Sequence, residues 1–275
     1  MRNLKRYGPG TLAIILATAL FLVPLAFMVL TAVKDRRQAA KLDWSWPTNF
    51  SLLENLQQVI SARNFMLVTA FVNSTILTLV SITVLVVLAA MVAWVLQRRR
   101  SRWNGVANFL ILSGLIIPPA VVPTIWVLQG LGLFKTMPGL ILVEVAFGMS
   151  FCVMIFRAFI STIPRELDEA AVIDGCGPVR LFFRVIFPLL RSVIVTVVVV
   201  QSVAIFNDFQ NPLYFFPGDK NATVQLTLFN FQSQFTTSYN LLFTDILLVT
   251  IPPLIMYLFF NRQIVAGMTA GAVKG

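Results

Sequence analysis

The chain has 275 residues, of which 58% are hydrophobic and only 12% are charged. A soluble globular domain carries about 25% charged residues, so the composition excludes an ordinary soluble protein. Basic residues outnumber acidic ones by 21 to 11, which gives a net charge of +10. In a soluble chain this excess would suggest a nucleic-acid partner, and its distribution along the sequence decides what it means here.

Six long apolar runs along the chain are predicted to cross a membrane as helices. The first run holds 23 residues without a charge, and as a helix it would be about 35 Å long. It is too long, and too poor in small residues at a cleavage position, for a removable signal peptide. The sequence therefore predicts an all-α, polytopic fold in a single transmembrane domain, residues 1–275. The predicted spans are 11–33, 69–96, 106–129, 137–156, 186–206 and 241–260.

The basic residues are distributed unequally between the two sides of the membrane that these six spans define. The side that carries both termini takes 14 of the 21 lysines and arginines. Short cytoplasmic segments are enriched in these residues, so both termini are predicted to be cytoplasmic. The excess charge thus indicates orientation in membrane lipid, and no nucleic-acid partner is expected.

The predicted cytoplasmic loop 161–185 is polar and lies between two apolar spans. Pro164 suits the first turn of a helix, and the acidic residues that follow favour the positive end of a helix dipole. A stripe at helical spacing combines small or apolar residues with one acid, namely Leu167, Ala170, Ala171 and Asp174. The two alanines project so little that another surface could approach closely.

A turn is predicted directly after this short helix. Gly175 and Gly177 can adopt positive φ, and Pro178 can begin the next helix. The second helix is expected to run from Val179 into the fifth span. On this prediction, a partner that moved the loop would move a membrane helix directly.

The loop resembles that of the membrane subunits of ATP-binding-cassette (ABC) importers. Their loop reads Glu-Ala-Ala, three residues, Gly, nine residues and Ile-x-Leu-Pro. Here the corresponding residues are Glu169-Ala170-Ala171, Gly175 and Val185-Ile186-Phe187-Pro188, with Val for Ile and Phe for Leu. The wider loop and the segment 207–213 resemble the carbohydrate-importer branch. The tail 267–275 is similar to that of the subunit type represented by the second permease of the maltose importer.

The resemblance implies a permease subunit in a bacterial-type inner membrane. Such a subunit pairs with a second related permease and two cytosolic ATPase subunits, and an extracytoplasmic sugar-binding protein delivers the substrate. The cytoplasmic coupling helix docks on an ATPase, which implies contacts there for Glu169, Ala170, Ala171, Asp174 and Gly175. The tail reaches toward the ATPase dimer interface, which implies contacts for Thr269, Gly271 and Lys274.

The residues themselves do not indicate an enzyme. The sequence has no Gly-x4-Gly-Lys-Ser/Thr phosphate-binding loop, so ATP and magnesium are expected on partner chains. It has no histidine, and the two cysteines, Cys152 and Cys176, lie in different predicted environments. No metal site, and no cofactor within this chain, is therefore expected.

Polar residues near the predicted spans are candidates for the translocation pathway, although such residues also serve helix packing. The candidates are Asn73, Glu144, Asn207, Asp208 and Gln210. Two other functions stay open: a secondary transporter driven by an ion gradient, and a structural membrane protein without transport. The identity of the sugar also stays open, and the resemblance favours an oligosaccharide.

Overall fold

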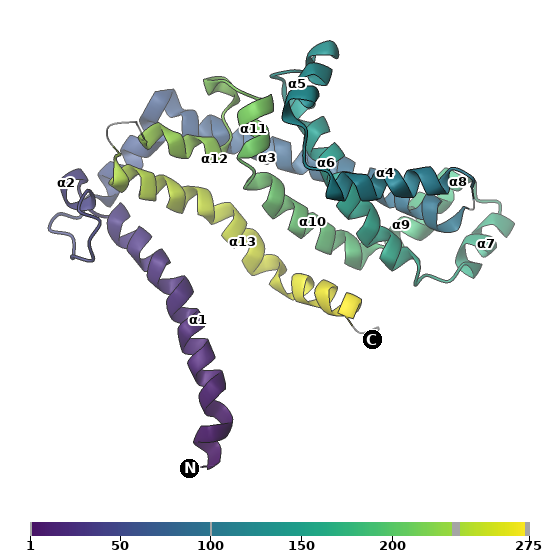
Figure 1. The fold of residues 1–275 in the computed structure, drawn as a ribbon, viewed down its shortest axis with the longest axis horizontal. Coiled ribbons are helices and arrows are strands. Elements are labelled where there is room, and N and C mark those ends of the chain that lie inside the picture. Colours follow the sequence, from purple (N-terminus) through teal and green to yellow (C-terminus); the bar gives the residue numbers. More distant parts are fainter. Residues whose placement is uncertain (1, 100, 233–236, 273–275) are drawn as a thin grey trace. The chain divides into compact units, whose positions relative to one another are not determined.

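The structure is a computed structural model that describes the backbone of residues 2–99, 101–232 and 237–272. The secondary-structure elements of these residues are helices (Figure 1). The longer ones are α1 (Arg2–Ala32), α3 (Leu52–Arg98), α4 (Asn104–Ile116), α5 (Val121–Gly130), α6 (Met137–Ile160), α10 (Arg191–Phe206) and α13 (Tyr239–Ala272). The shorter ones are α2 (Arg36–Ala39), α7 (Glu166–Ile173), α8 (Pro178–Leu181), α9 (Phe187–Leu189), α11 (Gln210–Phe215) and α12 (Val224–Thr227).

The chain divides into two compact units. Unit 1 comprises Met1–Thr69 and Val224–Ile251, and unit 2 comprises Ala70–Thr223 and Pro252–Gly275. Helices α3 and α13 each contribute to both units. The assignment of residues 1–275 to one permease domain stays a prediction.

Helices suited to crossing a membrane correspond to the predicted spans, although two of these are bent. Within the described residues, four helices are long and apolar enough to cross alone: Ala13–Ala32, Leu52–Arg98, Met137–Ile160 and Tyr239–Phe260. Two further pairs qualify only if each bent pair counts as one span, which gives six. The predicted spans 106–129 and 186–206 correspond to these two bent pairs.

The break within 106–129 has a local cause. Helix α4 ends at Ile116, and the chain turns by 120° before α5 begins at Val121. Ile117 is extended, with ψ 124°, because it precedes Pro118, and a residue before proline is disfavoured in the helical region. Pro118 and Pro119 also lack the amide hydrogens that would continue the helix. These prolines therefore end a helix instead of bending one gently.

The two long predicted outer loops contain helices. Helix α3 begins at Leu52, well before the predicted span at 69, and it is interrupted where residues 63–65 have φ between 45° and 59°. The loop 208–240 contains α11, α12 and two 3₁₀ turns. Apolar residues outside the six hydropathy maxima thus still form helices, because they pack within their own unit.

Unit 1 is held together by polar side chains that bind the carboxyl end of α1. The Asn55 side-chain amide donates to the carbonyl oxygens of Ala32 and Lys34 at 2.8 and 2.9 Å. Asn240 donates to the Asn55 side-chain oxygen at 2.7 Å, and Thr244 donates to the Ala32 carbonyl at 3.3 Å. The last carbonyls of a helix have no partner within it, so these bonds attach α1 to α3 and α13.

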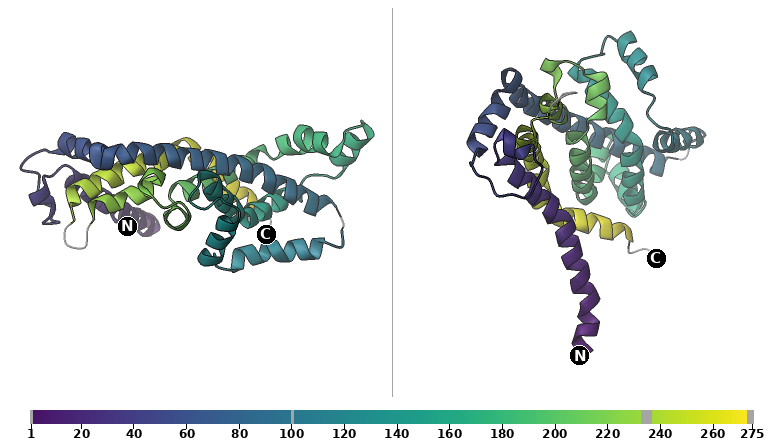
Figure 2. Two further views of the ribbon diagram at one scale, coloured as in Figure 1. Left: turned by 90° about the horizontal axis from the view of Figure 1, so that it is seen from above. Right: turned by 60° about the vertical axis from the view of Figure 1, so that its left-hand side comes forward.

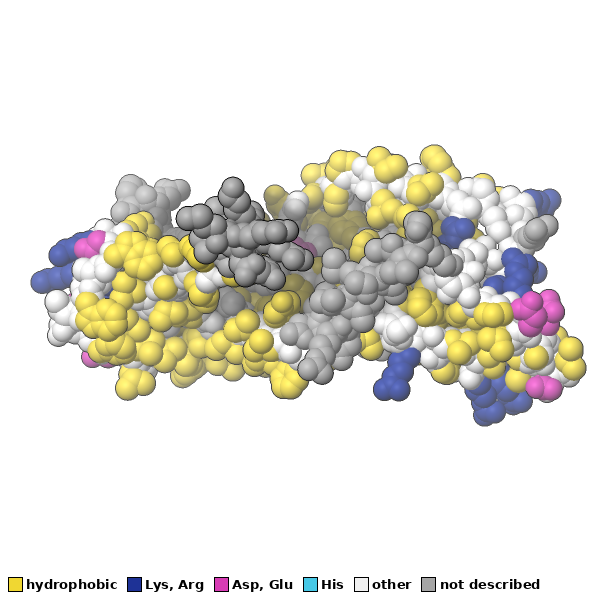
Figure 3. Space-filling model, turned by 90° about the horizontal axis from the view of Figure 1, so that it is seen from below, with side chains coloured by type: hydrophobic (Ala, Val, Ile, Leu, Met, Phe, Trp, Pro, Cys, Tyr) yellow, Lys and Arg dark blue, Asp and Glu magenta, His cyan; other side chains and the backbone are white. Residues whose placement is uncertain are grey.

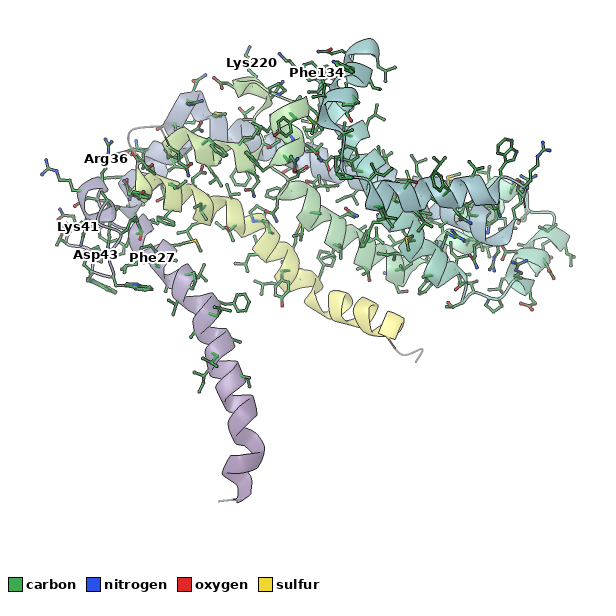
Figure 4. All side chains as sticks on the ribbon, in the orientation of Figure 1. Phe27, Arg36, Lys41, Asp43, Phe134 and Lys220 are labelled. Carbon is green, nitrogen blue, oxygen red and sulfur yellow. The ribbon has the colours of Figure 1, made fainter. Side chains whose placement is uncertain are left out.

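A buried lysine organises the loop that follows α2. The Lys34 ammonium is 1% exposed and donates to the carbonyl oxygen and the carboxylate of Asp43, at 2.7 and 3.1 Å. Ser45 also donates to this carboxylate. Figure 4 shows Asp43 in the loop near Phe27 of α1, whose ring packs against Trp44 at 5.2 Å. Trp44 and Trp46 are exposed.

Unit 2 has a close helix contact between α3 and α6. A Cβ atom at Gly148 of α6 would lie 2.7 Å from Leu85 Cδ2 of α3. Leu85 is fully buried in the core of this unit. Small residues allow membrane helices to approach closely, so glycine at position 148 sets the distance between α3 and α6.

We predict that Gly148→Ala lowers the free energy of unfolding by about 1–3 kcal/mol, because the added methyl group displaces Leu85 from its packed position. Gly105→Ala in α4 is the matched control, since a Cβ there meets nothing within 4 Å. The control should be neutral or stabilising by up to about 1 kcal/mol. Thermal unfolding in detergent measures the stability of both variants. Equal losses of stability would contradict the role of Gly148 in the close contact between α3 and α6.

We also predict a pH-dependent contribution from Asp43. Hydrogen bonds from Ser45 and then Lys34 lower the pKa of its carboxyl to about 2, whereas an unfolded aspartate has a pKa of about 3.9. The lowered pKa stabilises the folded state above about pH 4, and this contribution is lost as the pH falls toward about 2. The melting-temperature difference between wild type and Asp43→Asn should shrink over that range. A difference that stays constant would contradict the prediction.

Candidate functional site

Helix α7 forms where the sequence predicts a short helix. Arg165 occupies the N-cap position and Pro164 precedes it, so the proline lies just outside the helix. The first turn carries three acidic residues at the positive end of the helix dipole: Glu166, Asp168 and Glu169. The helix ends at Ile173, and Asp174 is its C-cap.

The turn after α7 requires a glycine at one position. The amide of Cys176 donates to the Ala171 carbonyl at 2.9 Å, and the amide of Gly175 donates to the Val172 carbonyl at 3.0 Å. This pair of bonds is a Schellman motif, and Gly175 takes its left-handed position with φ 78°. Gly177 instead has φ −68°, so the expectation of positive φ is wrong at that residue. Pro178 begins α8 as predicted.

The faces of α7 differ from the predicted stripe. Ala171 is buried in the core of unit 2 and is therefore inaccessible to another protein. Ala170, Glu169, Asp174 and Gly175 are exposed. Three large apolar side chains of the same helix are also exposed, Leu167 at 41%, Val172 at 60% and Ile173 at 84%. Helix α7 thus presents a mixed apolar and acidic surface.

This surface lies at one end of unit 2. Helices α7 and α8 project there (Figure 2, left), and α6 leads to them from the region of α5 and α11 (Figure 1). The space-filling view shows acidic and basic side chains gathered at the same end (Figure 3). Charged side chains at the end of a bundle of apolar helices are placed where water reaches them.

Helix α7 is attached to the carboxyl end of α3 by interactions that the sequence did not predict. The Asp168 carboxylate accepts a hydrogen bond from the Trp94 indole at 2.9 Å and pairs with Arg98 at 3.0 Å. Arg98 also donates to the Ile163 carbonyl at 2.9 Å, just before α7. Arg165 donates to the Gln97 carbonyl at 3.3 Å. In the sequence, Asp168 lies beside the motif and Trp94 lies near the end of a predicted span. Neither position predicts that the two side chains meet, because their contact depends on the fold.

The segment after α7 does not run straight into the next span. Residues 178–189 and α10 are bent by 78° relative to one another. A π-helical turn occupies Phe182–Ile186, and α10 begins at Arg191 after a non-helical Leu190. The predicted continuous helix from Val179 into the fifth span is therefore wrong, since a π-helical turn and a break interrupt it.

A second candidate site is a pocket of about 300 Å³ between α6 and α10. It contains carboxylate, amide and aromatic side chains. Its lining residues are Glu144, Phe147, Gly148, Phe151, Gln201, Ala204, Ile205 and Asp208. Two of the predicted pathway residues, Glu144 and Asp208, thus lie together. Phe147, Phe151 and Gln201 were not predicted; an isolated glutamine within an apolar span was the available signal.

The polar end of this pocket is ordered by α11. The Asn211 side-chain amide donates to Glu144 Oε1 at 3.1 Å. Asp208 Oδ1 accepts hydrogen bonds from the amides of Gln210 and Asn211, at 2.8 and 3.3 Å. Asp208 therefore binds the amino end of α11, and α11 in turn holds Glu144 through Asn211. Hydrogen bonds with α11 thus position both carboxyl groups.

The other predicted residues lie elsewhere. Asn73 does not line the pocket; its amide donates to the carbonyls of Lys220 and Ala222, at 3.2 and 2.9 Å. Asn207 and Gln210 are exposed and are absent from the lining. The structure describes only the backbone of Thr269 and Gly271, within α13, and Lys274 lies outside the described residues. Among described residues, no group of three or more His, Cys, Asp or Glu could hold a metal ion.

Comparison with known protein families identifies the family of this chain. Residues 85–269 match the family described as "Binding-protein-dependent transport system inner membrane component". The chain belongs to this family and is a multi-pass membrane protein, which confirms the resemblance drawn from the loop. The chain is therefore a transport component of the membrane.

Curated relatives match over nearly the whole chain. The "Melibiose/raffinose/stachyose import permease protein MelC" of Bacillus subtilis is 30% identical over 96% of this chain and 95% of its own length. The "Diacetylchitobiose uptake system permease protein NgcG" of Streptomyces coelicolor is 28% identical over 95% of this chain and 87% of its own length. Both matches include the first unit's amino-terminal part, which lies before the family match.

A solved structure shares the fold. A chain of a bacterial ABC transporter "involved in the import of the acidic polysaccharide alginate" superimposes with a TM-score of 0.79 at 16% identity. The superposition covers 95% of this chain and 98% of that chain. At this identity the likeness establishes the all-α permease fold and carries no information about the substrate.

We predict that Asn73→Ala loosens the segment 219–222, because it removes both hydrogen bonds that attach this segment to α3. At about 1 kcal/mol for each bond, amide hydrogen exchange in the segment should become roughly five- to thirtyfold faster. Asn104→Ala is the control, since its amide donates within its own turn, to the Arg99 carbonyl. Unchanged exchange at 219–222 in Asn73→Ala would contradict the anchoring role.

Proposed function

We propose that this chain is one of two related permease subunits in an importer for an oligosaccharide. Two ATPase chains would bind ATP and magnesium and drive transport from the cytoplasmic side, and an extracytoplasmic binding protein would deliver the sugar. The relatives support the substrate class, since MelC and NgcG are named for oligosaccharides. Family membership supports the dependence on a binding protein.

One observation supports the proposed coupling to ATP hydrolysis: α7 has an exposed face of apolar and acidic side chains, and its other side is attached to α3. Ile173 and Val172 are exposed although they are large and apolar, and Glu169 and Asp174 lie beside them. Exposed apolar side chains rimmed by charges mark a protein interface. The ATPase is the proposed partner, in contact with Glu169, Ala170, Asp174 and Gly175. Ala171 would support this face from inside.

This assignment fixes the proposed orientation. If α7 meets a cytosolic ATPase, the loop 161–185 is cytoplasmic, and with six spans both termini are cytoplasmic as well. The unequal distribution of basic residues supports the same orientation. The tail residues Thr269, Gly271 and Lys274 are proposed to approach the ATPase from that side.

The pocket between α6 and α10 is proposed to contact the passing sugar. Sugar hydroxyls can hydrogen-bond to the carboxyl groups of Glu144 and Asp208 and donate to the Gln201 amide oxygen. The Phe147 and Phe151 rings offer apolar faces to the C–H groups of a sugar ring. Two neighbouring carboxyl groups that share negative charge oppose an anionic sugar, so a neutral oligosaccharide is the proposed substrate. Polar groups within a membrane bundle commonly mark such pathways.

We predict that a Glu169→Arg/Ile173→Asp double variant loses the ATPase from the purified complex. Loss of one interface hot spot costs about 2 kcal/mol or more, which is at least roughly thirtyfold in affinity. The membrane level of the chain should stay normal, because both side chains are exposed. Arg180→Gln, an exposed residue of the neighbouring α8, is the control and should retain the ATPase. Retention of the ATPase by the double variant would contradict the proposal that α7 binds the ATPase.

A vesicle experiment tests the energy source. Proteoliposomes with the assembled complex and its binding protein should take up radiolabelled raffinose, maltotriose or trehalose when they contain ATP and no ion gradient. Uptake that needs an ion gradient and proceeds without ATP would instead establish a secondary transporter.

A further inference from the structure

The position of α7 depends on a cluster of three side chains, which we name the α3 clamp: Trp94, Arg98 and Asp168. Asp168 accepts from the Trp94 indole at 2.9 Å and pairs with Arg98 at 3.0 Å. The Arg98 and Asp168 side chains are only 13% and 17% exposed. A pair so poorly hydrated is weakly screened, and removal of one member leaves the other charge buried without compensation.

The α3 clamp joins α7 to a continuous part of α3. Between Ala70 and Arg98, α3 has no break, since its non-helical residues end at Phe65. One face of this stretch is buried in the core of unit 2 through Leu77, Leu85, Ala89 and Ala93. A packed helix moves as a rigid element. A displacement applied to α7 at Asp168 therefore reaches the centre of the unit along α3.

The alternative route from α7, along the chain into α10, is mechanically poorer. The chain first passes the turn at Gly175, then the π-helical turn Phe182–Ile186, and then the 78° bend before α10. Each of these interruptions lacks the regular hydrogen bonds that stiffen a helix. The aromatic ring of Phe182 packs against Trp94 at 5.7 Å, so this segment too rests on the end of α3.

We infer that Asp168, held by Arg98 and Trp94, is a positioning residue that transmits the movement of α7 into α3. The inference rests on the proposed function, because it takes α7 as the site where the ATPase acts. The proposed function concerns where the ATPase binds, whereas this inference concerns how the movement passes on into the permease. The exposed face of α7 binds the ATPase, whereas Asp168 faces the permease and determines where the movement goes.

The test measures whether α7 and α3 move together. Spin labels are placed at Glu166 of α7 and Val92 of α3, both exposed, in the assembled complex with Cys152 and Cys176 replaced by serine. We expect the same narrow distance distribution without nucleotide and with ATP plus vanadate. In Asp168→Asn the distribution should broaden and differ between the two states. An Asp168→Asn complex that keeps the narrow, unchanged distribution overturns the inference.

A second readout separates transmission from simple loss of structure. The amount of ATPase that co-purifies should stay normal in Asp168→Asn, while labelled raffinose, maltotriose or trehalose imported per ATP hydrolysed falls about tenfold, as expected for coupled contacting groups. A purely structural role would lower hydrolysis and import together, and that result would overturn the inference. Arg98→Gln/Asp168→Asn should be no worse than either single variant, and Arg180→Gln should match wild type.

The two proposals fail in different ways. If the Glu169→Arg/Ile173→Asp variant keeps its ATPase, the docking site on α7 is wrong. If that variant loses its ATPase but Asp168→Asn leaves the label distances and the import per ATP unchanged, docking is right and transmission through the α3 clamp is wrong.

Discussion

A bilayer offers no water to an unpaired backbone group, and this constraint accounts for where polar side chains occur in the described part of the chain. The carboxyl end of α1 leaves carbonyl oxygens without helical partners, and Asn55 and Thr244 bind them. Asn73 serves the carbonyls of Lys220 and Ala222 in the same way. Polar residues in the apolar sequence thus mark ends and irregular segments of the backbone. Asn73, one of the predicted pathway candidates, serves in the structure as a support for the fold.

The same constraint separates two kinds of polar site in unit 2. At one end of α6, Glu144 and Asp208 border a pocket, and α11 holds both by hydrogen bonds. At the other end, Asp168 is bonded to Arg98 and Trp94, while Glu169 and Asp174 are exposed to solvent. Neighbouring acids of one short helix therefore have opposite tasks. One fixes the helix to its own protein, and the others are available to a partner.

The bends of the chain limit how force can travel through it. Prolines 118 and 119 end a helix within one apolar run, and a π-helical turn with a 78° bend precedes α10 in another. Bent segments of this kind can line a pathway without transmitting a push along their axis. The unbroken part of α3 can transmit one, because its buried face is packed into the core. On the proposed function, conduction and transmission would therefore belong to different helices.

The all-α membrane class, the family and the place of α7 could be predicted from the residues alone, because hydropathy, capping residues and the Glu-Ala-Ala and glycine spacing act over a few turns of one helix. Gly175 was predictable since its left-handed position depends only on local hydrogen bonds. Three features became visible only in the folded chain: Ala171 is buried, Asn73 supports a distant segment, and Asp168 contacts Trp94 and Arg98. Those contacts join residues separated by dozens of positions, and the packing of helices, which no local pattern encodes, brings them together.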